Sequence, residues 1–467
     1  MERVLPKTLD YTDVLPLAVE SRSRRRTFFP TNGATFTSTG ANIIRIDLSA
    51  DALLDTQHSY LRFDFTPTLA GQSCGIDTAG GHAFIRRMRV EQSGTVLEDI
   101  NNYNRLMGAV VLPCQSGADH HNERSITEHV RASGEVSARI ATTAQSQYAT
   151  TAATATSTAL NVGSHHQLDG QVPTGQSVTF SIPLNTGLLN SDKLLPLMLM
   201  SAPLTIEIEL ATTSQPVCWS ADPAAGLYTI DNVRYIANLV EVGQDVAGQL
   251  RMVQEMSGGV LTLAGQSYRH FTGSVTNTTG EQVINVPARV KSMKSMFFVS
   301  SGAVPDSFGA YDVSYGGNMS LNDYQIKIGS VVYPPTPIKC GFGDGDPNDG
   351  GVVFTRSEAL MELAKSWGNV GSTKGLGQLN STRYATSKGT KSTSALPEVF
   401  YCPFGMDLEA FQRVAIESGV NTADRSLPIS LVLGFSQAPA DGTQVEVFVL
   451  ADALFYINGD GSMSVSI

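Results

Sequence analysis

Histidine is the residue type whose spacing in this chain first suggests metal binding. His120 and His121 are adjacent, His165 and His166 are adjacent, and His129 stands alone between the two pairs. Zinc sites combine histidine with cysteine, or place two ligands on one face of a helix. Neither arrangement is present here. We therefore expect solvent-exposed loop histidines, and the sequence predicts no metal site and no cofactor.

An aspartate-rich stretch at residues 341–350 resembles a calcium-binding loop at first sight. An EF-hand loop that began at Asp344 would need glycine at its sixth position and a bidentate glutamate at its twelfth. The chain has Asp349 and Thr355 at these two places. An acidic loop without a bound calcium ion is therefore the better interpretation.

The cysteines are scattered and include no Cys-x-x-Cys pair, which favours free thiols over a metal site or a disulfide framework. Free cysteines behave as small hydrophobic residues and are usually buried. We expect this of all of them: Cys74, Cys114, Cys218, Cys340 and Cys402.

Common enzyme motifs are missing, and the sequence offers no catalytic residue. There is no Gly-x-Ser-x-Gly elbow and no His-Glu-x-x-His, and Gly389-Thr-Lys-Ser lacks the upstream glycine of a phosphate-binding loop. The alternative is a β-sandwich that acts on or binds carbohydrate. A pair of catalytic carboxylates can be far apart in the sequence and close together in the fold, so it need not leave a motif. Sugar sites usually present aromatic side chains. Only Trp219 and Trp367 are available as tryptophans, and Trp367 lies on a helical apolar stripe that predicts a core position.

The composition indicates a protein built from β-strands. Hydrophobic residues make up 42% of the chain, charged residues only 16%, and the net charge is −11. Ser, Thr, Gly, Ala and Asn take the place of the Glu, Lys and Arg that dominate helical surfaces. The negative charge argues against a protein that coats nucleic acid over its whole surface. We also expect synthesis inside the cell without membrane insertion, because signal-peptide and membrane-helix patterns are missing.

Many stretches alternate between apolar and polar residues with a period of two, which is typical of strands with one face on a core. The clearest are residues 44–48, 61–65, 204–210, 429–435 and 445–449. Helical patterns are few: a capping box at 355–358 opens the best one, and 102–111 and 244–256 are weaker. Many strands with few short helices predict an all-β protein made of sandwiches.

The second half of the chain repeats the pattern of the first. Residues 178–184, 204–210 and 228–242 correspond in order and kind to 399–404, 429–435 and 445–457, and residues 88–97 correspond to 324–333. The two copies are separated by roughly 230 residues, which exceeds the period of any solenoid. The pattern predicts two duplicated domains.

Two groups of strand-like segments stand in a distinctive order. The first group is Thr27-Phe-Phe-Pro-Thr-Asn-Gly, Asn42-Ile-Ile-Arg-Ile-Asp-Leu and Ser59-Tyr-Leu-Arg-Phe-Asp-Phe. The second group is Phe180-Ser-Ile-Pro-Leu, Leu194-Leu-Pro-Leu-Met-Leu-Met and Leu204-Thr-Ile-Glu-Ile-Glu-Leu. The first group resembles the opening strands, and the second the end of the first jelly roll, of the double jelly-roll major capsid proteins of tailless icosahedral DNA viruses. The resemblance covers nearly the whole chain in strand pattern and order, and polinton-like viruses and virophages are the most similar of these families.

This resemblance implies two tandem eight-stranded jelly rolls with a few short helices. The expected organisation is an N-terminal arm at 1–28, a first roll at 29–243, a connecting helix at 244–258 and a second roll at 259–467. The implied function is structural: the chain forms homotrimeric, pseudo-hexagonal capsomers (hexons) that tile the icosahedral shell of the virion. Synthesis and assembly are expected inside the host cell. The implied partners are neighbouring capsomers and penton and minor capsid proteins, with no small-molecule substrate.

Two further segments have features that suit surface contacts. The run of Arg22, Arg24, Arg25 and Arg26 could hold the arm against a capsid neighbour, an internal membrane or packaged genome, and a solvated arm explains it equally well. Residues 141–163 and 371–395 are poor in large apolar residues, so they predict exposed loops at one end of the fold.

Overall fold

Two β-sandwiches make up most of the chain in the computed structural model. The structure describes residues 20–68, 73–130, 171–173, 175–211, 216–219, 228–301, 313–317, 319, 321–341, 356–368, 370, 376–377, 379, 384, 402–411, 418–424, 426–439 and 441–467. Every helix within these ranges falls short of the length and apolar character needed to cross a bilayer. Both predicted loop segments fall largely or wholly outside the described residues.

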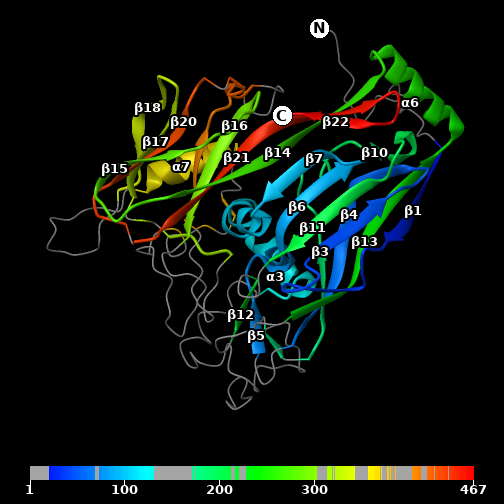
Figure 1. The fold of residues 1–467 in the computed structure, drawn as a ribbon, viewed down its shortest axis with the longest axis horizontal. Coiled ribbons are helices and arrows are strands. Elements are labelled where there is room, and N and C mark those ends of the chain that lie inside the picture. The colour runs from blue at the N-terminus through cyan, green and yellow to red at the C-terminus, as the bar shows by residue number, and fades with distance from the viewer. Residues whose placement is uncertain are drawn as a thin grey trace, which may run out of the picture.

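The first sandwich, on the right in Figure 1, consists of two antiparallel sheets. Its main strands are β1 (Ser21–Phe28), β3 (Ile43–Leu48), β4 (Leu53–Pro67), β6 (Ile85–Gln92), β7 (Thr95–Asn101), β9 (Val178–Ile182), β11 (Leu204–Leu210) and β13 (Tyr228–Val242). One sheet has the order β1-β13-β4-β9 and the other β3-β11-β6-β7. The short strands β2 (Thr35–Thr37) and β10 (Leu195–Pro196) extend the first of these sheets.

The second sandwich repeats this strand order. Its strands are β14 (Val260–Ser274), β15 (Gly280–Asn285), β16 (Met293–Ser301), β17 (Leu321–Ile328), β18 (Val331–Lys339), β19 (Phe404–Asp407), β20 (Ile429–Phe435), β21 (Gln444–Asn458) and β22 (Met463–Ser466). The sheet orders are β14-β21-β16-β19 and β15-β20-β17-β18, with β22 beside β21. Each of the eight main strands of one roll therefore has a counterpart in the other: β1 in β14, β3 in β15, β4 in β16, β6 in β17, β7 in β18, β9 in β19, β11 in β20 and β13 in β21.

Alternating burial shows why these sequences form strands. Every second residue of β11 and of β20 is buried, and the residues between them are half-buried. The buried positions carry Leu and Ile in both strands, with Phe ending β20, and face the opposite sheet of the same sandwich. Period-two patterns thus gave the correct strands at 44–48, 61–65, 204–210, 429–435 and 445–449.

A stacked aromatic pair occupies the same place in both cores. Phe63 of β4 lies opposite Phe180 of β9, with ring centroids 5.2 Å apart and an interplanar angle of 14°. Phe298 of β16 lies opposite Phe404 of β19 at 5.0 Å and 16°. Such pairs contribute beyond the area they bury. The repeat predicted from the sequence therefore extends from strand order to the packing of individual side chains.

Helices and a small fifth sheet fill the connections. The helical segments are η2 (Gly80–Phe84), α1 (Tyr103–Arg105), the π-helix η3 (Leu106–Val111), α2 (Leu112–Gln115), α3 (Ala118–Thr127), η5 (Leu197–Leu199), α6 (Gln244–Met256) and α7 (Ser357–Ser366). The small sheet has the order β12-β5-β8, from β5 (Ser73–Ile76), β8 (Gln171–Pro173) and β12 (Val217–Trp219). In Figure 1 it lies at the end of the first roll opposite to α6.

The helix predicted at 244–256 is present as α6 and joins the last strand of the first roll to the first strand of the second. The division of the chain at 244–258 remains a proposal that this position supports. The helix α7 also forms, but it begins at Ser357 after Arg356, which has no side-chain cap hydrogen bond. Glu358, predicted to close a capping box, instead accepts a hydrogen bond from the Lys339 amide at 3.1 Å. Thr355 lies outside the described residues.

Residues 21–28, predicted as part of an N-terminal arm, form a strand of the first roll instead. β1 pairs with β13 along its whole length, from Ser21 opposite Val242 to Phe28 opposite Tyr235. It is an edge strand whose first six residues are exposed, so it lacks the apolar alternation by which the other strands were identified. The first roll therefore already includes residues 21–28, which the predicted boundary at residue 28 assigns to the arm.

Candidate functional site

The candidate ligand residues do not come together as a metal site. Among the described residues no group of three or more His, Cys, Asp or Glu side chains could hold a metal ion. His129 was expected in an exposed loop and is buried instead, with its ring against Phe180 and its Nε2 2.9 Å from the Thr179 carbonyl oxygen. Burial lowers the pKa of His129 below its ordinary value. The acidic stretch after Gly341 and the pair at 165–166 lie outside the described residues.

The described cysteines are free and buried, as the sequence predicted: Cys74, Cys114, Cys340 and Cys402. Burial raises the pKa of each of these thiols, which keeps them protonated and unreactive. Trp367 belongs to the core as predicted, where it stacks on Phe297 with centroids 4.6 Å apart. The cysteines and this tryptophan therefore have structural roles.

Polar residues instead gather where the two rolls meet. Arg105, from the helical connection after β7, is buried and crosses into the second roll. Its Nη2 donates to the Ser300 carbonyl oxygen at 2.9 Å, and its Nη1 donates to the carbonyl oxygens of Val313, at 2.9 Å, and Tyr315. A buried guanidinium with backbone acceptors fixes both position and orientation of the rolls.

A second polar group lies beside it. The Glu446 carboxylate of β21 binds the His270 ring of β14, and the Asn102 amide of the first roll donates to Glu446 at 3.2 Å. Burial acts to raise the pKa of Glu446, but the hydrogen bonds to His270 and Asn102 and the nearby Arg105 guanidinium outweigh it, so the pKa lies below its ordinary value. The carboxylate therefore stays ionised at the junction.

A side-chain amide and a pair of glycines complete this junction. The Gln92 side chain of β6 donates to the Gly461 carbonyl oxygen at 3.1 Å and accepts from the Met463 amide at 2.6 Å, so it pairs with β22 like a strand residue. Gly265 of β14 lies against Gly187, whose carbonyl oxygen would be 2.7 Å from a Cβ at position 265. Only glycine allows this contact. The junction is thus closely packed and specific.

A polar cleft of about 610 Å³ lies between the rolls, lined by residues such as Asn185, Gln266 and Trp367. At its floor the Lys294 ammonium lies 2.9 Å from a Glu409 oxygen and 3.6 Å from an Asp452 oxygen. All three are largely buried, and the single ammonium offsets part of the negative charge of the two carboxylates. The ammonium thus bridges two carboxylates in the manner of a structural ion pair.

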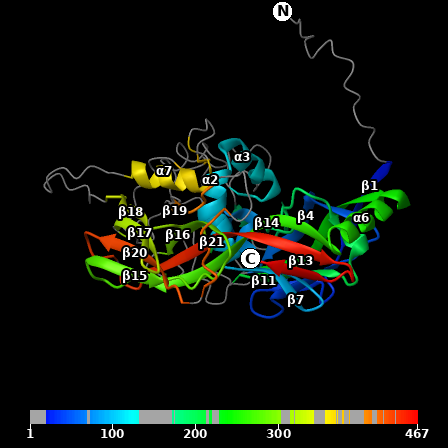
Figure 2. The same cartoon turned by 90° about the horizontal axis from the view of Figure 1, so that it is seen from above.

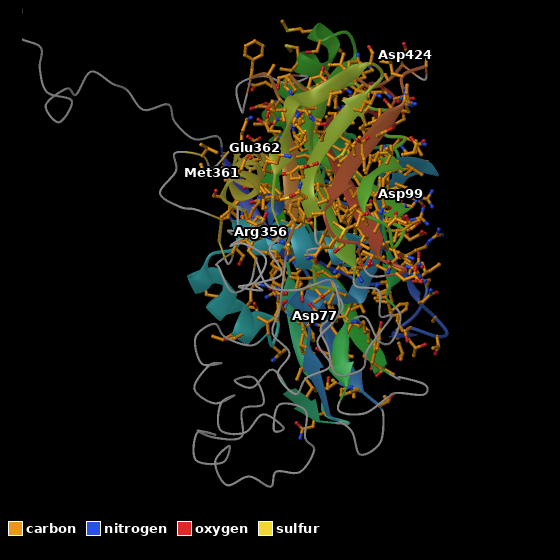
Figure 3. The ribbon with its side chains drawn as sticks, turned by 90° about the vertical axis from the view of Figure 1, so that its left-hand side faces the viewer. Asp77, Asp99, Arg356, Met361, Glu362 and Asp424 are labelled. Atoms are coloured by element: carbon orange, nitrogen blue, oxygen red, sulfur yellow. The ribbon has the colours of Figure 1, made fainter. Side chains whose placement is uncertain are left out.

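The outer faces of the sheets differ in character. The β3-β11-β6-β7 sheet carries a ladder of ion pairs across neighbouring strands, such as Arg45 with Glu207 at 2.6 Å and Arg87 with Asp99 at 2.6 Å. On its counterpart in the second roll, the residues facing outward from β20 are Ser430, Val432 and Gly434. Figure 3 shows Asp99 on the side of the molecule opposite to the α7 helix. The faces of the rolls, rather than a pocket, are therefore the candidate functional site.

The basic run is held on β1 at the edge of the first roll. Arg24 pairs with Glu241 at 2.8 Å, Arg25 donates to the Tyr60 hydroxyl at 3.3 Å, and the Arg26 guanidinium lies 4.7 Å from the Phe28 ring centroid. These side chains remain exposed. The arginines are thus arranged by the sheet and not carried on a free arm.

The residues at the junction were not identified from the sequence, although two of them gave a signal. Glu446 interrupts the apolar run of β21, whose residues from Val445 onward are almost all buried. Arg105 is the one charge in the weak helical pattern at 102–111. A charge inside an otherwise apolar stretch is unfavourable unless it is paired, so each of these charges indicates a buried partner, although the sequence does not say which residue that partner is.

The fold is that of a double jelly roll, with two eight-stranded rolls of identical topology in one chain. Solved capsid structures share it. The PBCV-1 virus capsid protein is 11% identical with a TM-score of 0.57, covering 98% of this chain and 99% of that one. The Faustovirus major capsid protein is 8% identical at 0.54, covering 98% and 93%. The mavirus major capsid protein is 11% identical at 0.50, covering 100% and 96%.

No protein-family model and no curated protein sequence matches the chain. The predicted fold class and the resemblance to double jelly-roll capsid proteins are therefore confirmed by the structural likeness, at the level of the fold. The similar structures include a virophage protein as well as those of PBCV-1 and Faustovirus, and the likeness does not separate these branches.

Proposed function

We propose that this chain is a major capsid protein, which forms pseudo-hexagonal homotrimers that tile an icosahedral shell. The observation that supports this most is the duplicated topology itself: two rolls with the same strand order, over the full length of both this chain and the capsid proteins it resembles. Two similar units in each chain let three chains approximate six-fold packing in a closed ring.

The proposed role is structural, without catalysis. The buried charges described above are paired or hydrogen-bonded, and the cleft between the rolls contains an ion pair. The work of such a protein is self-association, which needs large complementary faces. Location in the virion shell, and contacts with penton and minor capsid proteins, follow from the same proposal.

Contact of Arg22, Arg24, Arg25 and Arg26 with genome or an internal membrane stays a prediction. Their exposure on β1 supports it, since exposed arginines attract phosphate groups. The pairing of Arg24 with Glu241 leaves fewer free charges for such a contact.

The mass of the purified protein in solution tests the proposal. Light scattering should give three times the 49.8 kDa chain mass. A monomer that stays monomeric at high protein concentration would contradict it. Glycan-array binding by that monomer would then favour a sugar-binding sandwich.

A further inference from the structure

Lys294 is a buried lysine on an interior strand of the second roll, with a carboxylate on each side. It lies in β16, which has β21 as one neighbour and β19 as the other. Its Nζ is 2.9 Å from Glu409 Oε1, just past the end of β19, and 3.6 Å from Asp452 Oδ1 in β21. An amine and two carboxyl groups therefore meet across three neighbouring strands.

This cluster is largely closed off from solvent. The side chains of Lys294, Glu409 and Asp452 are exposed at only 8%, 9% and 7%. Figure 2 shows α7 lying over the sheet that contains β16, β19 and β21, and the end of α7 lines the same cleft. Burial of charged groups is costly because water no longer solvates them. The site therefore favours a reaction that removes two of its charges.

Serine hydroxyl groups hold both carboxylates in place. Ser418 Oγ donates to Glu409 Oε1 at 2.6 Å, the same oxygen that faces the ammonium. Ser292 Oγ donates to Asp452 Oδ2 at 2.8 Å and accepts a hydrogen bond from the Gly419 amide at 3.0 Å. Asp452 thus presents Oδ1 to the ammonium while a donor binds Oδ2. Such a donor stabilises the negative charge that develops on a carboxyl oxygen under nucleophilic attack.

The backbone directs Lys294 toward Asp452. The pairing of β16 with β21 has a bulge between Met293 and Ser295, and Lys294 is the extra residue. Bulges next to reactive sites re-aim a side chain in this way. Oriented groups react when their atoms are roughly 3–3.5 Å apart, and the Nζ to Oδ1 distance is 3.6 Å. A small side-chain rotation therefore brings the amine within reach of the carboxyl carbon.

We propose that Lys294 and Asp452 become joined by an amide bond between Nζ and Cγ, with Glu409 relaying the protons. The reaction takes place once in each chain and acts on no external substrate. It ties β16 to β21 covalently. The inference goes beyond the proposed capsid function and does not depend on it.

The reaction uses only groups of this cluster. Glu409 first relays a proton from the ammonium to Asp452 Oδ1, which gives a neutral amine and a neutral carboxylic acid; Oε1 is within hydrogen-bond reach of Nζ for this step. The free electron pair of Nζ then attacks Cγ, and the electrons of the carbonyl bond move onto Oδ2, to which Ser292 donates. Glu409 relays a second proton from the nitrogen to Oδ1, which leaves with its bonding electrons as water while the carbonyl bond re-forms. One ammonium and one carboxylate are thus replaced by one amide and one water, without an oxidant.

A second lysine–aspartate pair in the same roll provides an internal comparison. Lys339 of β18 lies 2.8 Å from Asp323 of β17, but its side chain is 55% exposed. Water solvates an exposed pair, and its ions gain little from becoming neutral. We therefore expect Lys339 to remain a free amine.

The mass of the denatured full-length chain tests the proposal. The unmodified chain should be one water lighter than its sequence mass. Lys294→Arg should restore the full mass, because a guanidinium keeps the positive charge but is not a nucleophile. Asp452→Asn should still react, with loss of ammonia instead of water, and should reach the same final mass as the unmodified chain. Lys339→Arg is the matched control and should remain one water lighter than its own sequence mass.

Glu409→Gln tests the proton relay. The amide keeps the size of the side chain but cannot carry a proton between the two groups, and loss of general acid–base catalysis slows a reaction by about a hundredfold or more. Most chains of this variant should therefore keep their full mass when freshly purified. A variant that reacts as completely as the unmodified chain would overturn the role given to Glu409.

Peptide mapping locates the bond. Succinimide formation at an Asp–Gly sequence such as Asp441-Gly442 also removes one water, so mass alone does not identify the linkage. Trypsin should fail to cut after Lys294 and should release a branched peptide that contains Lys294 and Asp452, while it cuts normally after Lys339. A chain of full mass, or a dehydrated chain that trypsin cuts after Lys294, would overturn the proposal.

The same samples separate this inference from the capsid proposal. Trimers built from chains of full mass would overturn only the amide bond, and monomers that contain the bond would overturn only the capsid proposal. A cross-link restricts the unfolded chain, so Lys294→Arg should also unfold at a lower urea concentration than Lys339→Arg. Circular dichroism of both variants before unfolding checks that they fold.

Discussion

Arg62 and Phe297 occupy the same position in the two rolls, one residue before the stacked phenylalanine of each core. Their cross-strand neighbours are Arg234 and Phe448. In the second roll this sheet face is covered by Trp367 and the first roll, and both phenylalanines are fully buried. In the first roll the face is charged, and among the described residues its side chains stay partly exposed, as at Arg62 with 29%. The side chains on the inner faces of the two rolls are therefore similar. Those on the outer faces differ according to whether other parts of the chain cover them.

Placing each of these two residue types in the other roll should give the largest difference in unfolding free energy. Phe297→Arg places a charge without a partner under Trp367 and should cost on the order of 4 kcal/mol or more of unfolding free energy. The reciprocal Arg62→Phe, on the partly exposed charged face, should change the unfolding free energy of the isolated chain by less than about 0.5 kcal/mol. Urea unfolding of both variants measures the difference. Equal costs would mean that the two faces are not distinct.

Removing the stacked rings should affect both rolls alike. Phe63→Ala and Phe298→Ala each leave a cavity in a closely packed core and should each cost about 3–5 kcal/mol. The matched measurement is urea unfolding followed by fluorescence and circular dichroism. A cost for one substitution and none for the other would show that the two cores are not equivalent in packing.

Removing the hydrogen bonds that Arg105 makes between the rolls should reduce the unfolding free energy by a smaller amount. Arg105→Met keeps the length of the side chain but leaves the carbonyl oxygens of Ser300, Val313 and Tyr315 without this donor. We expect a loss of about 2–3 kcal/mol. Calorimetry should also show the single unfolding transition splitting into two. Arg86→Met, on the exposed face, is the control and should unfold like the unmodified chain.

Acid should weaken the same junction, with the smallest effect. The pKa of Glu446 is lower in the folded protein than its ordinary value of 4.5, so the unfolded chain takes up the proton first. The stability that Glu446 contributes is complete above that ordinary value and is lost as pH falls through the lower folded value. Glu446→Gln should flatten this part of the dependence of unfolding free energy on pH. An unchanged slope would contradict the role given to Glu446.

Sequence patterns predicted most of the fold because strand formation is governed by local alternation. β11 and β20 alternate without interruption, and both were predicted correctly. β1 was missed because an edge strand with exposed arginines has no buried face for a pattern to reveal. The cap of α7 was missed because Glu358 binds the Lys339 amide, a contact between elements that no local pattern contains.

The junction between the rolls could not be predicted for the same physical reason. Glu446 and His270 are 176 positions apart in the sequence, and Arg105 reaches acceptors more than 190 positions away. His129 looked like a loop residue, yet its backbone turn brings it against Phe180. Contacts at such separations depend on how distant strands pair within a sheet and on how the two rolls dock, which single-residue patterns do not specify.

Negative-stain images of the purified oligomer test the central claim most directly. If the two rolls of each chain act as equivalent units, class averages should show a three-chain particle with six lobes around a hexagonal rim. Two-lobed particles, or rings in which the two rolls are not equally spaced, would contradict the account.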